Sequence, residues 1–65
     1  MMFTIILGFG EEAQEREIEG ATRALKVALN YEMEKRLHRI RCPDGRKLTY
    51  SEFAAAVKAG EFGDA

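Results

Sequence analysis

The 65-residue sequence has a single cysteine, a single histidine, a single proline and no tryptophan. One cysteine cannot build a disulfide framework, so we expect a reduced, cytoplasmic chain. A structural zinc site needs about four ligands, mostly Cys or His, and only His38 and Cys42 are present. A lone thiol without a resolving partner is also a poor redox centre. The sequence therefore predicts neither a metal nor another cofactor.

Long hydrophobic runs and an excess of one charge are also absent. A membrane-spanning helix needs about 20 apolar residues, whereas the apolar run at the start covers only residues 2–9. Ten basic residues nearly balance eleven acidic ones, so the overall charge does not indicate a membrane or nucleic-acid partner. The apolar content of 46% is too high for a disordered chain. We expect one small domain over residues 1–65, which a homodimer or a partner would help to stabilise.

Residues 2–9 are predicted to form a strand. The segment MFTIILGF is β-branched and aromatic, carries no charge and is bounded by glycine. Apolar residues on both faces favour an inner strand. Phe3, Ile5, Leu7 and Phe9 alternate onto one face, which this chain or a second copy would bury.

Residues 11–37 are predicted to form one long helix, because they lack proline and are rich in strong helix formers. Gly20 is the one poor helix former in the segment. At helical spacing an apolar stripe faces the core. Its expected members are Ile18, Ala21, Ala24, Leu25, Ala28, Leu29 and Tyr31.

Residues 38–50 are predicted to form a β-hairpin around the turn Pro43-Asp44-Gly45. Alternation places His38, Ile40 and Cys42 on an inner face and Arg39, Arg41 and Lys47 on an outer one. Thr49 and Glu52 then fit a capping box for a helix over 50–59, followed by a tail over 60–65.

This order predicts an α+β fold: a small two-layer β-α-β-β-α domain with a three-stranded sheet, one long helix and one short helix. A right-handed crossover through the long helix would make the first two strands parallel.

No enzyme signature stands out. Residues 8–13, GFGEEA, match G-x-G-x-x-A after a strand, but the glutamates would repel a pyrophosphate and the chain is too short for a dinucleotide domain. His38 is the only imidazole base for Ser51 or Cys42, and no nucleophile-elbow motif surrounds either residue. We expect a chain that is not an enzyme.

Two charged segments carry the functional hypotheses. Residues 11–19 hold five glutamates and one arginine, and on the expected helix Glu11, Glu12, Glu15 and Glu19 form an acidic ridge that would bind a partner protein. Residues 35–47 hold six basic residues and one acid. In the alternative hypothesis the hairpin binds nucleic acid through Arg39, Arg41, Arg46 and Lys47. The two segments would lie at opposite ends of the long helix.

The leading hypothesis is a small non-enzymatic regulator that docks on a larger protein or complex and blocks it. Size and charge layout are typical of small regulators from phages or mobile elements that inhibit nucleic-acid-handling machines, such as anti-CRISPR proteins, an analogy that rests on no specific motif.

Overall fold

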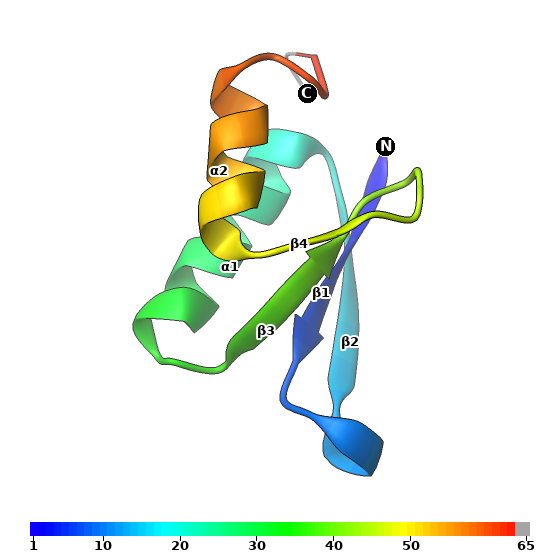
Figure 1. Ribbon diagram of the computed structural model, residues 1–65, viewed down its shortest axis with the longest axis vertical. Helices are drawn as coiled ribbons and strands as arrows, with labels where there is room; N and C mark the ends of the chain where they lie inside the picture. Colours follow the sequence, from blue (N-terminus) through cyan, green and yellow to red (C-terminus); the bar gives the residue numbers. More distant parts are fainter. Residues whose placement is uncertain (64–65) are drawn as a thin grey trace.

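The computed structural model describes residues 1–63, which form four strands, two α-helices and one short 3-10 helix (Figure 1). In chain order they are β1 (Met2–Leu7), η1 (Gly10–Glu12), β2 (Gln14–Glu19), α1 (Ala21–Met33), β3 (Leu37–Arg41), β4 (Lys47–Leu48) and α2 (Tyr50–Lys58).

The strands form one antiparallel sheet in the order β2-β1-β3-β4. Both helices lie on one side of it (Figure 1), which confirms the predicted two-layer α+β class with two helices. The sheet has four strands instead of three. Because the additional strand β2 reverses the chain before α1, β1 and β3 run antiparallel and not parallel.

The predicted helix over residues 11–37 is the main correction. Its first part is η1 and β2, and only Ala21–Met33 is α-helical. Gly20 separates the two parts with a φ of 91°, which few residues other than glycine adopt. Pairing of β2 with β1 along six residues outweighs the helix propensity of the glutamates, because propensity is a weak preference that tertiary contacts override.

The first strand is the inner strand that was predicted, but it ends at Leu7 and not at residue 9. Phe3, Ile5 and Leu7 lie in the core. Phe9 does not: it is 75% exposed in the loop between β1 and β2. Gly8 has a φ of 76°, which turns the chain out of the strand before Phe9.

The core is built on three phenylalanines from distant parts of the chain. The ring of Phe3 lies 5.4 Å from that of Phe53 and 5.0 Å from that of Phe62, centroid to centroid. Ile5 and Ile40 fill the sheet side of this cluster and are fully buried. Phe62 is buried and so holds this part of the tail against the domain; residues 64–65 of the predicted tail lie outside the described residues.

The long helix meets the sheet mainly through alanine. Ala21, Ala24 and Ala28 are buried, and Leu25 and Tyr31 pack at the margin of the core. Leu29, predicted in the same stripe, is instead exposed. Small side chains let the axis of α1 lie close to the sheet.

The predicted hairpin and second helix are confirmed, with the helix ending at Lys58 instead of residue 59. The turn closes through a bond from the Cys42 amide to the Arg46 carbonyl, 2.8 Å. At the start of α2 the Glu52 amide donates to the Thr49 hydroxyl, and the Thr49 amide donates to the Glu52 carboxylate. The predicted capping box is therefore present.

Replacing Gly20 should test its role as the break between β2 and α1. We expect Gly20→Ala to lower the free energy of unfolding by about 1–3 kcal/mol, because alanine is strained at this backbone conformation. Urea unfolding followed by circular dichroism measures it. Thr22→Ala, an exposed change two residues away, is the control; equal stability of both variants would contradict this role.

The capping box predicts a pH dependence of stability. Hydrogen bonds from Thr49 hold the pKa of Glu52 below its usual value. A lowered folded-state pKa adds stability above the unfolded pKa, and this is lost as the pH falls through the folded one. Glu52→Gln keeps a capping group without the charge. We therefore expect its Tm to fall below that of the wild type at neutral pH and to converge on it in acid; a difference independent of pH would contradict the assignment.

Candidate functional site

The sheet face away from the helices carries most of the charged residues of three strands, β2, β3 and β4. Directly opposite residues in an antiparallel pair lie on the same face, and Ile5, Ile18 and Ile40 mark the buried face. The residues on the open face are Met2, Thr4 and Ile6 of β1, Glu15, Glu17 and Glu19 of β2, Arg39 and Arg41 of β3, and Lys47 of β4.

This face has an acidic row on β2 and a basic row on β3 and β4, with β1 between them. Arg41 reaches across β1 to Glu15, with its Nη2 atom 3.2 Å from Oε1 and its Nη1 atom 3.5 Å from Oε2. Thr4 and Ile6 beneath are only 8% and 7% exposed, because the long charged side chains cover them. The acidic and basic segments were predicted at opposite ends of a helix; this expectation was wrong, since they meet on one face.

The four predicted acidic residues do not share a helix face. Glu11 and Glu12 lie in η1, at the tip of the β1–β2 hairpin, which extends beyond the rest of the domain (Figure 1). Glu15 and Glu19 lie on β2, and Glu17 stands between them on the same face. Glu17 was not among the residues predicted for the acidic ridge. Its signal was the period-two spacing of the three glutamates, which marks one face of a strand.

Among the four predicted basic residues, Arg39, Arg41 and Lys47 share the open face as expected. Arg46 lies in the turn instead, where its Nε atom is 2.7 Å from Asp44 and its Nη2 atom 3.4 Å from Glu61. Hydrogen bonds from Arg46 keep the pKa of Asp44 below its usual value. Arg39 donates to the His38 carbonyl at 2.8 Å. Carboxylates therefore already neutralise Arg41 and Arg46.

His38 and Cys42 do not form a common site. The register between β1 and β3 shifts beside His38, and its ring packs against Phe9 at a centroid distance of 4.4 Å instead of lying inside with Ile40. Cys42 is buried as predicted, and burial raises the pKa of its thiol. Within residues 1–63, no three His, Cys, Asp or Glu residues are grouped as a metal site requires.

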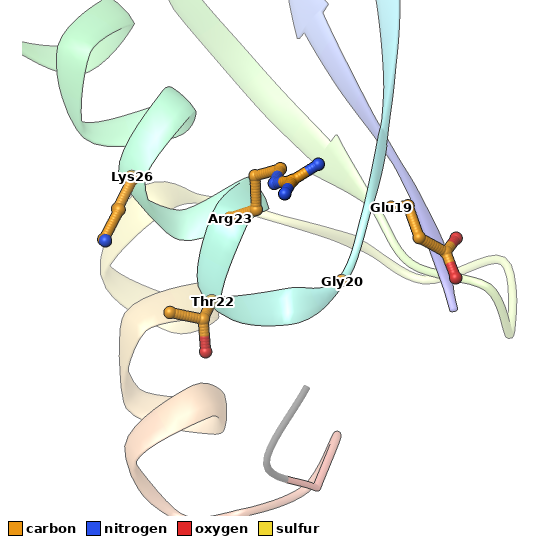
Figure 2. Close-up of a pocket in the computed structure, with 5 residues that line it drawn as sticks. All are labelled: Glu19, Gly20, Thr22, Arg23 and Lys26. Atoms are coloured by element: carbon orange, nitrogen blue, oxygen red, sulfur yellow. The ribbon is translucent and has the colours of Figure 1, made fainter.

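The surface depressions are open and shallow. One of about 370 Å³ lies where β2 meets α1 and is lined by Glu19, Gly20, Thr22, Arg23 and Lys26. Figure 2 shows Arg23 extending from α1 toward β2, while Glu19 and Lys26 point away from each other. The lining contains no nucleophile paired with a base. The depression offers charge of both signs and no arrangement for covalent chemistry.

Comparison with known proteins gives no relative. No family model, no curated protein and no solved structure matches the chain. Neither helix within residues 1–63 has the length and apolar character needed to cross a membrane.

The burial of Cys42 predicts slow chemical modification. A buried thiol with a raised pKa is largely protonated at neutral pH and reacts only when the hairpin opens. We expect maleimide to label Cys42 about a hundredfold or more slowly in the folded protein than in urea. Ser51→Cys in a Cys42→Ser background places a thiol at an exposed position and should react at once. Equal labelling rates for the two thiols would contradict the burial.

Proposed function

We propose that this chain is a non-enzymatic regulator that binds a larger protein through its acidic residues. The observation that carries the proposal is the set of acidic residues on η1 and on the open face of β2, namely Glu11, Glu12, Glu15, Glu17 and Glu19. Carboxylates in a row complement a basic surface and steer its approach.

The charge balance within this surface supports a binding role. Glu15 is held by Arg41, and Glu19 lies 3.1 Å from the Met1 amino group. Glu11, Glu12 and Glu17 form no ion pair within the part of the chain that the structure describes. These three carboxylates are available to a partner without breaking an internal contact.

Nucleic-acid binding through Arg39, Arg41, Arg46 and Lys47 is the alternative, and the shared outer face of three of these residues favours it. The neighbouring glutamates weigh against it. A phosphate backbone laid across Arg39 and Arg41 would pass close to the acidic row of β2, whose carboxylates repel it at short range. We therefore rank protein binding first.

Two finer expectations rest on size and charge alone. One is that the partner is a nucleic-acid-handling machine that a phage or mobile-element protein blocks, as anti-CRISPR proteins do. The other is that the chain forms a homodimer. Both remain predictions.

The proposal is tested by capturing partners from the native host, with nuclease added, and then measuring the affinity of the purified partner. Changing Glu11, Glu12, Glu17 and Glu19 to glutamine should weaken binding about tenfold or more, since each exposed charge pair contributes up to about 1 kcal/mol. The control is Glu32→Gln/Glu34→Gln, which removes charge from the end of α1.

Unchanged affinity of the acidic variant would contradict protein docking through this surface. Binding to duplex or single-stranded oligonucleotides at low salt, lost in Arg39→Ala/Arg41→Ala/Lys47→Ala, would establish the alternative instead.

A further inference from the structure

The strand β2 is an open edge of the sheet. It is last in the strand order and pairs only with β1. Its six residues carry no proline and no bulge, and Figure 1 shows it at the margin of the sheet. Edge strands are commonly protected by shortness, proline or a bulge. β2 has none of these three features, and only its charged side chains protect it from pairing with other strands.

The hydrogen-bonding pattern between β1 and β2 shows which backbone groups of β2 point toward the free edge. The Gly20 amide donates to the Met1 carbonyl at 2.8 Å, one step beyond the pair Met2–Glu19. Bonded and non-bonded pairs alternate along an antiparallel ladder. The bonded pairs of β2 therefore involve Gln14, Arg16 and Ile18. The amides and carbonyls of Glu15, Glu17 and Glu19 point away from β1, toward the free edge.

Each of these three glutamates thus offers both a carboxylate on the open face and backbone groups at the edge. When a new strand pairs with β2 in antiparallel orientation, residues whose amide and carbonyl groups point toward the shared edge stand directly opposite one another. A second copy added at β2 would place glutamate opposite glutamate in every such register, and like charges directly opposite destabilise a sheet. A strand with basic residues at the same alternating positions would meet the opposite charge at each one.

We propose that β2 binds an extended segment of its partner protein as an additional antiparallel strand, with Lys or Arg at every second residue, opposite Glu15, Glu17 and Glu19. This rests on the proposed protein-binding function and specifies how the partner is recognised. Main-chain bonds supply the attachment, and the alternating charges set the register. The intervening partner residues lie on the helix side, next to Arg16 and Ile18, where threonine or a small apolar residue fits.

A synthetic peptide in which lysine alternates with threonine is the probe. Nuclear magnetic resonance of the labelled protein, with hydrogen exchange, should show new protection at the Glu15, Glu17 and Glu19 amides. The Arg16 and Ile18 amides should change little, because they already bond to β1. Protection at every second residue is a signature that general attraction between opposite charges does not produce.

Two matched peptides separate strand addition from charge. One has the same composition with its lysines in a block; the other is methylated on the lysine backbone nitrogens, which keeps every charge and removes the donors. Each should bind about tenfold or more weakly than the alternating peptide. On the protein, Glu17→Gln/Glu19→Gln should weaken binding, whereas Glu32→Gln/Glu34→Gln, with the same change in charge, should not.

Equal binding of the methylated and unmethylated peptides, or no protection at the three amides, overturns strand addition. If binding without protection is still weakened by Glu17→Gln/Glu19→Gln, acidic docking survives and only its mode is wrong. Failure of every peptide also overturns strand addition, while the proposed function is judged separately by the affinity of the captured partner.

Discussion

The structure depends on the pairing of β1 along both of its edges. This strand has no charged residue, and its alternate backbone groups are bonded to β2 on one side and to β3 on the other. Phe3 forms the aromatic cluster with Phe53 of α2 and Phe62 of the tail, and Ile5 is buried in the same core. On the opposite face of β1, the Arg41–Glu15 ion pair shields Thr4 and Ile6 from solvent. Core, sheet and charged surface therefore share one central element.

The parts of the fold with strong local signals were predictable from the sequence. The turn at Pro43-Asp44-Gly45, the capping box at Thr49 and the uncharged first strand each have a local physical cause. The segment over residues 11–19 does not: its glutamates favour helix in isolation, and only pairing with β1 makes it a strand. Gly20 marked the boundary, but its positive φ cannot be distinguished in a sequence from a tolerated helical glycine.

The candidate site was predictable as residue types but not as an arrangement. Two of the three glutamates on the open face and its three basic residues were identified, yet they were assigned to two separate surfaces. The error follows from the misplaced strand, because a helix of residues 11–37 would hold Glu15 far from Arg41. A single change from helix to strand brings the two side chains into contact. Which charged residues share a surface can therefore be decided only after the strand register is known.

The two edges of the sheet are unequal in length. β4 has two residues and runs directly into α2, whereas β2 has six. The short edge strand β4 offers much less backbone for pairing than β2, so we expect only one edge of the sheet to accept a further strand. If β2 binds its partner as proposed, each domain would take up one partner strand and would not link successive copies of the partner into a chain. A partner strand bound at β2 would complete the sheet on that side, and no further strand would be added at the β4 edge.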